Sequence, residues 1–268
     1  MRTSRAQFIA PKPGQPVLFD QVPEASPEQN GILVLPPQDV LQTLQSLPHP
    51  VTTTILDPWY NKGIGGFRED YHQWLATVVQ AAANVSDHIF LWGFPEIIYR
   101  VMDYIPEGFI LKAWLTWYYK NCPSVIRGWR SAHMSCLHLA KETARMYPEH
   151  FLNEAQLEKQ RQGKLRYMPG PPNVMEESLL VGFVGKSEQT GHPSQKPVKV
   201  IEPLVLMTTK EGDIVLDPMC GSGTTGAACR NLGRRAVLCD MSEEYLQMTE
   251  KRLTVQRAET SDALEAFF

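Results

Sequence analysis

The sequence predicts an α/β protein in which a mostly parallel sheet carries helices on both faces. Short β-branched or apolar runs alternate along the chain with longer stretches that repeat their apolar residues at helical spacing. Three of the apolar runs end at a carboxylate, at Asp57, Asp217 and Asp240. Because parallel strands meet ligands at their carboxyl ends, these acids are expected to face one cleft.

The elements follow in chain order from these patterns. Strands are expected at residues 51–56, 88–92, 109–117, 136–139, 214–216 and 236–239. Helices are expected at residues 70–84, 95–104, 198–209, 226–232 and 243–253. The first of these helices has an apolar stripe at helical spacing, made by Trp74, Leu75, Val78, Val79 and Ala82.

Residues 215–225, Val-Leu-Asp-Pro-Met-Cys-Gly-Ser-Gly-Thr-Thr, are the most informative stretch. A strand, a glycine turn and a helix in this order expose backbone N–H groups and allow a ligand to approach the main chain. No Lys-Ser or Lys-Thr follows the glycines, and their spacing differs from G-x-G-x-x-G, so neither a P-loop nor the dinucleotide fingerprint is present. Asp240, at the end of the next strand, is well placed to bind ribose hydroxyls.

A second motif lies far upstream, where the strand of residues 51–56 leads into Asp57-Pro58-Trp59-Tyr60. An aromatic amine is a poor nucleophile because its lone pair is delocalised into the ring. A carboxylate and a backbone carbonyl that each accept one N–H localise that lone pair. An aromatic side chain beside them provides a surface on which an extruded base stacks. Either motif alone is compatible with an ordinary turn after a buried strand, but the two together favour a site.

Both motifs resemble those of one family, the DNA amino-methyltransferases. Residues 217–225 resemble its S-adenosylmethionine loop, residues 57–60 resemble its catalytic Asp-Pro-Pro-Tyr tetrapeptide, and the match continues from His192 to Leu253. Residues 57–60, called the tip below, precede the glycine loop of residues 217–225 in the chain, as in the permuted β class of this family. The resemblance implies a Rossmann-like, S-adenosylmethionine-dependent methyltransferase fold, circularly permuted so that the catalytic half precedes the cofactor half.

The resemblance also assigns roles at the tip. Asp57 and the Pro58 carbonyl would accept the amino N–H groups, and Tyr60 would stack on the base. Trp59 stands where the family usually has proline, and it either widens the stacking surface or packs inward.

Cofactor contacts are implied for the glycine loop, for Asp240 and for three residues elsewhere in the chain. Ser194 and Lys196 belong to the segment His-Pro-Ser-Gln-Lys-Pro, where Ser194 is alternatively a cap of the following helix. Asp39 would lie near the adenine, although Gln38 replaces the usual preceding glycine. The complete predicted set is Asp39, Ser194, Lys196, Asp217, Pro218, Cys220, Gly221, Gly223, Thr224, Thr225 and Asp240.

Five segments are expected along the chain. Residues 1–31 form an arm rich in proline and polar residues, residues 32–140 the catalytic half, and residues 191–254 the cofactor half of the same domain. Residues 141–190 form a small insert at the family's target-recognition position, with a surface helix and linker as the alternative. Residues 255–268 form a C-terminal tail.

Double-stranded DNA is the partner that this resemblance implies. Basic residues lie among aromatics between residues 111 and 135, which suits phosphate contacts and base stacking, although a buried aromatic strand with solvated charges at its ends is the alternative and is favoured for residues 109–117. Basic residues recur in the polar insert. The predicted DNA contacts are Lys120, Arg127, Arg130, Lys159, Arg161, Lys164 and Arg166. Because the insert is small, a short recognition site, a homodimer, or a separate specificity or restriction partner is expected.

Composition limits the other classes of function. The net charge is −3, so a basic footprint has to be local, and five cysteines without Cys-x-x-Cys pairs suit a reducing interior. The seven histidines show no metal-ligand spacing, and no apolar run is long enough to cross a membrane. These observations lead us to expect a cytoplasmic protein without a metal, and the family resemblance implies a prokaryotic or phage source.

The predicted activity is methyl transfer from S-adenosylmethionine to an exocyclic amino group of a flipped DNA base. N6 of adenine is favoured because an acid opens the tetrapeptide, whereas enzymes acting on N4 of cytosine more often carry serine there. N4 of cytosine is the alternative. A non-catalytic DNA-binding module of this fold and an RNA or protein amine as substrate are more distant.

Overall fold

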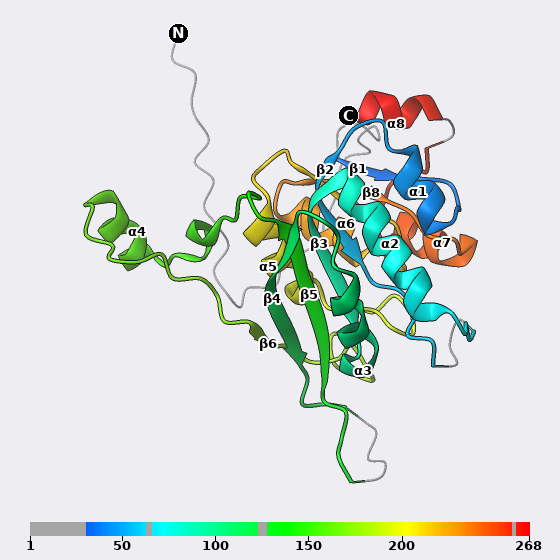
Figure 1. Ribbon diagram of the computed structural model, residues 1–268, viewed down its shortest axis with the longest axis horizontal. Helices are drawn as coiled ribbons and strands as arrows, with labels where there is room; N and C mark the ends of the chain where they lie inside the picture. Colours follow the sequence, from blue (N-terminus) through cyan, green and yellow to red (C-terminus); the bar gives the residue numbers. More distant parts are fainter. Residues whose placement is uncertain (1–30, 63–65, 123–127, 259–260) are drawn as a thin grey trace.

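The computed structural model describes residues 31–62, 66–122, 128–258 and 261–268, and these residues build one sheet covered by helices (Figure 1). Its eight strands lie in the order β1-β8-β7-β2-β3-β5-β4-β6. Only β5 runs antiparallel to its neighbours, so the sheet is mostly parallel as predicted.

The six predicted strands are present, with ends that differ by up to three residues, and two short strands are added at the sheet edges. The predicted strands are β2 (Val51–Leu56), β3 (Ser86–Gly93), β4 (Phe109–Tyr118), β5 (His133–Lys141), β7 (Ile214–Asp217) and β8 (Arg235–Leu238). The added edge strands are β1 (Ile32–Val34) and β6 (Val174–Glu176). Each has three residues, which is too short for a periodic pattern to be recognised.

Two apolar layers separate the sheet from its helices. One face of the sheet packs against α1 (Val40–Ser46), α2 (Tyr71–Val85), α3 (Pro95–Ile98) and α8 (Ser261–Phe267). The other face packs against α5 (Val198–Thr208), α6 (Thr224–Asn231) and α7 (Glu243–Leu253). In β3 the side chains of Ile89 and Leu91 join the first layer, and those of Phe90 and Trp92 join the second. This alternation is the period of two that a strand covered on both faces requires.

Three details of the predicted helices were wrong. The helix expected at residues 95–104 is the short α3 followed by a 3-10 helix at Tyr99–Tyr104. Helix α6 begins two residues earlier than expected, because Gly223 adopts a left-handed φ of 74° and ends the loop directly before Thr224. Ser194 does not cap α5, whose N-cap residue is Pro197.

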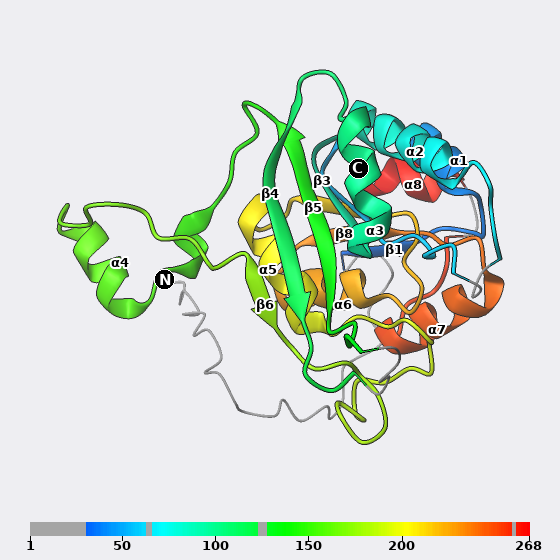
Figure 2. The same cartoon turned by 60° about the horizontal axis from the view of Figure 1, so that its bottom comes forward.

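The C-terminal tail contains a helix that was not predicted, and the insert contains a surface helix, which was the predicted alternative for this segment. In the tail, α8 buries Leu264 and Phe267 against the first apolar layer. In the insert, α4 (Glu154–Arg161) buries no residue and projects away from the sheet in both views (Figures 1 and 2). Sequence periodicity cannot detect α4, because a helix without a buried face has no apolar stripe. Apart from Gly31, the arm predicted at residues 1–31 lies outside the described residues.

Candidate active site

A cavity of about 970 Å³ opens at the carboxyl edge of the sheet, and both sequence motifs line it. Strands β2 and β7 are hydrogen-bonded neighbours, so the tip that follows β2 and the glycine loop that follows β7 meet there although they are far apart in the chain. The predicted site residues on its wall are Asp39, Asp57, Pro58, Trp59, Tyr60, Ser194, Lys196, Asp217, Pro218, Cys220, Gly221, Thr224, Thr225 and Asp240. Of the predicted catalytic and cofactor residues, only Gly223 lies off this wall.

Glycine is required in the loop by its backbone angles and by its neighbours. Gly221 has a φ of 52°, in the left-handed region, and a Cβ atom there would lie 3.0 Å from Nε2 of His192. At Gly223 a Cβ atom would lie 2.9 Å from Cγ2 of Thr249. The two glycines let the chain turn tightly from β7 into α6 and keep its backbone open to a ligand.

Asp217 braces this turn from below. Its carboxylate accepts the Met219 N–H at 3.1 Å and the Thr225 hydroxyl at 2.5 Å. The side chain is buried without a cation beside it, and this burial raises its pKa to about 7. The thiol of Cys220 is also buried, which raises its pKa well above the ordinary value, so it remains protonated and is no nucleophile.

Asp240 and Asp39 are oriented by backbone N–H groups. Asp240 accepts the Gly221 N–H at 3.0 Å and the Ser242 N–H at 2.9 Å, so it joins the end of β8 to the glycine loop. Burial raises the pKa of Asp240. Asp39 caps α1 by accepting the Leu41 N–H at 2.8 Å. Each of these carboxylates retains free lone pairs toward the cavity for the sugar and base contacts that were predicted.

At the tip, the side chains of Asp57 and Tyr60 are joined to each other. The Tyr60 hydroxyl donates to Oδ1 of Asp57 at 3.0 Å, and the ring of Phe94 meets the Tyr60 ring edge-on at 4.9 Å. Burial, followed by the charge of Asp57, raises the pKa of Tyr60 well above its ordinary value. The hydroxyl is therefore a neutral donor that keeps the ring in one orientation.

Trp59 packs inward against α2, which is one of the two predicted alternatives, and the residue also lines the cavity. Its ring contacts those of Tyr71 and Trp74 of α2, with ring centroids 5.2 Å and 4.6 Å away. The Tyr71 hydroxyl donates to the Trp59 carbonyl. An aromatic cluster therefore holds the tip against α2. This packing takes the place of the backbone stiffness that a proline at position 59 would supply.

Lys196 was predicted as a cofactor contact, and its ammonium lies at the tip. Nζ pairs with Oδ2 of Asp57 and donates to the Tyr60 hydroxyl at 3.0 Å. Ser194 lies on the cavity wall and is exposed.

Several cavity residues were not predicted as site residues. Phe94 follows β3, Tyr119 follows β4 and Met134 begins β5, so the sheet places all three at the same edge as the motifs. His192 lies beneath Gly221 with its ring 4.3 Å from that of Tyr245, and burial lowers its pKa. The rule that strand ends meet at one edge would identify Phe94 and Tyr119 once the strands are known. Met134 would not be found by this rule, because β5 is antiparallel and it is the start of this strand, not its end, that lies at the cavity edge.

The predicted DNA contacts that the structure describes lie outside the cavity. Lys120 pairs with Glu176, and Arg130 donates to the carbonyls of Lys120 at 2.8 Å and Cys122 at 3.3 Å. The remaining predicted residues that are described, Lys159, Arg161, Lys164 and Arg166, are exposed on α4 and the segment after it. Arg127 lies outside the described residues.

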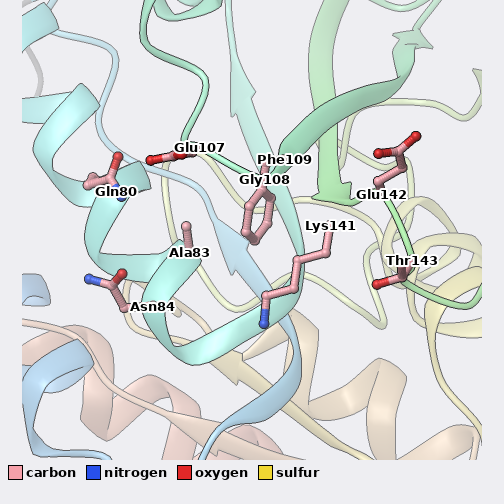
Figure 3. A pocket seen from close by; sticks show the side chains of 9 residues that line it. All are labelled: Gln80, Ala83, Asn84, Glu107, Gly108, Phe109, Lys141, Glu142 and Thr143. Carbon is pink, nitrogen blue, oxygen red and sulfur yellow. The ribbon is translucent and has the colours of Figure 1, made fainter.

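A second, smaller cavity of about 300 Å³ lies at the opposite edge of the sheet (Figure 3). It is lined by the end of α2, the start of β4 and the end of β5, including Phe109 and Lys141. It contains none of the predicted site residues. In the described part of the chain no group of three or more His, Cys, Asp or Glu is arranged to hold a metal ion. Nor is any helix described there long and apolar enough to cross a membrane.

The main cavity fits S-adenosylmethionine. Its volume is at the upper end for small-molecule sites and leaves room for a base beside the cofactor. Gly221 and Gly223 have no side chains that would block the loop. Asp217 and Asp240 stand at the ends of the adjacent strands β7 and β8. These are the features that a nucleoside ligand requires at the end of a parallel sheet.

Comparison with known proteins agrees with this geometry. The model of the DNA methylase family matches residues 51–251. Among relatives, the type II methyltransferase M.HpaI of Haemophilus parainfluenzae is 29% identical over 80% of this chain and 72% of its own. The DNA adenine methyltransferase YhdJ of Escherichia coli is 27% identical over 81% of both chains.

Two solved structures share the fold. The M1.HpyAVI–SAM complex has a TM-score of 0.65 and 24% identity over 84% of this chain and all of that one. The cytosine-N4-specific PvuII DNA methyltransferase has a TM-score of 0.62 and 15% identity over 88% of this chain and 93% of that one. The predicted fold, family and cofactor are confirmed: the chain belongs to the DNA methylase family, as an S-adenosylmethionine-dependent DNA amino-methyltransferase.

Proposed function

We propose that this enzyme methylates N6 of adenine at a specific site in double-stranded DNA. The observation that carries the proposal is the shared cavity, in which an Asp-Pro-x-Tyr tip and a glycine loop from neighbouring strands face the same space. Adenine is favoured because Asp57 occupies the first position of the tip, and because the relative YhdJ is a DNA adenine methyltransferase. N4 of cytosine is the alternative, since the PvuII enzyme has the same fold.

The proposed mechanism uses the tip to activate a weak nucleophile. Asp57 and the Pro58 carbonyl each accept one N–H of the amino group, which localises the nitrogen lone pair. Bound S-adenosylmethionine would supply the electrophilic methyl group, with its sulfonium S–CH3 bond broken and S-adenosylhomocysteine as the leaving group. The nitrogen gains this methyl group and loses one proton, for which a carboxylate oxygen of Asp57 is the acceptor.

Aromatic side chains would hold the extruded base. Tyr60, oriented by Phe94 and by its bond to Asp57, provides the stacking surface, and Trp117 and Tyr119 line the same cavity. This wall is largely apolar and excludes water from the reacting atoms. A dry surrounding strengthens the hydrogen bonds to the amino group.

Contacts to the DNA backbone are proposed for the β4–β5 connection and for the insert. Helix α4 has exposed basic residues and no buried face, so its basic side chains are available for contacts with phosphates. The nearly fully exposed Trp129 and Phe183 add apolar surface to the segments around the cavity. A homodimer or a separate specificity subunit would supply the readout that so small an insert lacks.

The test is a nucleoside analysis. Purified protein is incubated with mixed-sequence duplex DNA and S-adenosylmethionine, and the DNA is digested and analysed by mass spectrometry. N6-methyladenine is the expected product. N4-methylcytosine would show that Asp57 does not select adenine, and absence of any methylated nucleoside despite cofactor binding would point to a missing partner or to a binding role.

A further inference from the structure

Lys196 is the only lysine or arginine classed as buried in the described part of the chain. Its side chain is 3% exposed. The ammonium pairs with Oδ2 of Asp57, donates to the Tyr60 hydroxyl at 3.0 Å, and lies 5.0 Å from the centre of the Trp92 ring. Burying an ammonium costs several kcal/mol unless its donors are satisfied, and these three contacts supply what the buried charge requires.

The backbone of Lys196 is anchored to the other half of the site. Its carbonyl accepts the Thr224 hydroxyl at 3.1 Å, directly after the glycine loop. The Thr224 oxygen in turn accepts from Arg252 at 2.8 Å. On the preceding residue, the Gln195 amide accepts from the Thr190 N–H and hydroxyl and donates to the Glu188 carbonyl. Lys196 is therefore held on a braced segment whose main chain binds the cofactor loop and whose side chain binds the catalytic tip.

The Asp57 carboxylate is consequently gripped at both oxygens. The Tyr60 hydroxyl donates to Oδ1 and the Lys196 ammonium to Oδ2. Each carboxylate oxygen has the capacity for two hydrogen bonds and accepts one from these side chains, so one lone pair on each remains for a substrate N–H. Without the ammonium, the carboxylate is held only by the Tyr60 hydroxyl at one oxygen, and its alignment with the amino group is less well fixed.

We propose that Lys196 is the residue that positions Asp57. Its side chain holds the Asp57 carboxylate, and its main chain fixes the position of that carboxylate relative to the glycine loop. The proposal rests on the proposed function, because it presumes that Asp57 accepts the amino N–H. It replaces direct cofactor contact, the role that the family resemblance suggested for this lysine, with a role that acts through Asp57.

The kinetic test compares Lys196→Met, which keeps the apolar stem, with Lys199→Met, an exposed residue on the same segment. Lys196→Met should lower kcat on the order of 100-fold, the size of effect that follows from loss of one contact that aligns the reacting group. The dissociation constant of S-adenosylmethionine should stay within about 3-fold of the wild-type value. Lys196→Arg should restore part of kcat, and Lys199→Met should leave it unchanged. A weakened cofactor affinity with normal kcat at saturation would overturn the proposal.

A double-variant test examines whether Lys196 acts through Asp57. In single-turnover assays, Lys196→Met added to Asp57→Asn should slow methyl transfer no further than Asp57→Asn does alone. Losses that multiply would show that the two residues act independently, and would contradict the proposal.

A stability readout separates this proposal from the proposed function. Asp57→Asn leaves a buried ammonium without its counter-ion, so it should lower the Tm, and adding Lys196→Met should raise the Tm again. Additive losses of Tm would refute the coupling even in an active enzyme. If the pair is coupled but the wild type transfers no methyl group, the proposed function fails and the pairing stands.

Discussion

The catalytic tip and the cofactor loop begin with the same dipeptide at the ends of neighbouring strands. Asp57-Pro58 follows β2, whereas Asp217 is the last residue of β7, the strand hydrogen-bonded to β2, and Pro218 follows it. In each, the proline stiffens the chain directly after the acid. The two acids nevertheless have opposite surroundings.

Charge pairing is what distinguishes them. Asp57 is paired with the ammonium of Lys196, and 22% of its side chain is exposed to the cavity. Asp217 is buried, accepts only the neutral donors of Met219 and Thr225, and has its pKa raised to about 7. The Asp-Pro dipeptide fixes the backbone at each acid. The surrounding side chains determine the rest: Asp57 faces the cavity, and Asp217 stabilises the glycine loop.

The largest expected effect is at Asp57. Asp57→Asn removes the charged acceptor, and kcat should fall by about three orders of magnitude, since one hydrogen bond to the reacting group supplies a factor of roughly 10² to 10³. The affinity for S-adenosylmethionine, measured by calorimetry, should change little because the glycine loop is untouched. The matched control is Asp87→Asn, which removes a surface carboxylate paired with Lys141. Unchanged turnover in Asp57→Asn would eliminate the proposed mechanism.

Asp217→Asn should change the pH dependence of stability instead of the chemistry. The pKa of Asp217 is raised in the folded protein, so the stabilisation that it contributes is complete below pH 4 and is lost as the pH rises through 7. Over this window the variant should gain on the order of 4 kcal/mol relative to the wild type, from a shift of roughly three pKa units.

Urea unfolding of the wild type and of Asp217→Asn at pH 5 and pH 8 captures about two thirds of this difference, on the order of 3 kcal/mol, because only about two pKa units of the shift lie above pH 5. Buried histidines such as His138, whose pKa is lowered to about 3 mainly by burial, contribute equally to both proteins and cancel. Parallel stability curves would show that Asp217 titrates at its ordinary value.

Trp59→Pro should cost stability while sparing catalysis. The change restores the residue usual in the family and removes the packing against Tyr71 and Trp74. For a half-buried aromatic this loss is about 2 kcal/mol. Because Asp57, Tyr60 and the Pro58 carbonyl remain, kcat should stay within about 5-fold, well under the factor expected for loss of a direct contact to the reacting group. A drop in kcat/KM of more than tenfold without loss of stability would mean that Trp59 contacts the base.

The smallest effect is expected on α4 and the segment that follows it. Lys159→Ala and Lys164→Ala should weaken DNA binding at all sequences and reduce the salt dependence of the binding constant by about one counter-ion each. Lys210→Ala is the control, since this exposed lysine precedes β7 at the edge opposite the cavity. Equal salt slopes for all three variants would remove this element from the DNA interface.

Much of this architecture was predictable because its signals are local. The predicted helix stripe Trp74, Leu75, Val78, Val79 and Ala82 is buried in α2, and both motifs lie at the strand ends where they were expected. The edge strands β1 and β6 were missed, and the unburied helix α4 was expected only as the alternative for the insert, without bounds. They owe their structure to neighbours or to local capping, and they carry no periodic apolar pattern of their own.

The sequence by itself determined the fold class, the family, and the two motifs that share a cavity, since strand signals, glycine turns and strand-end acids are properties of short segments. Only the tertiary structure decided that Trp59 packs onto α2, and that the ammonium of Lys196 lies on Asp57 instead of in the glycine loop. Such contacts join residues far apart in the chain. The burial and charge that they create do not exist until the sheet brings the segments together.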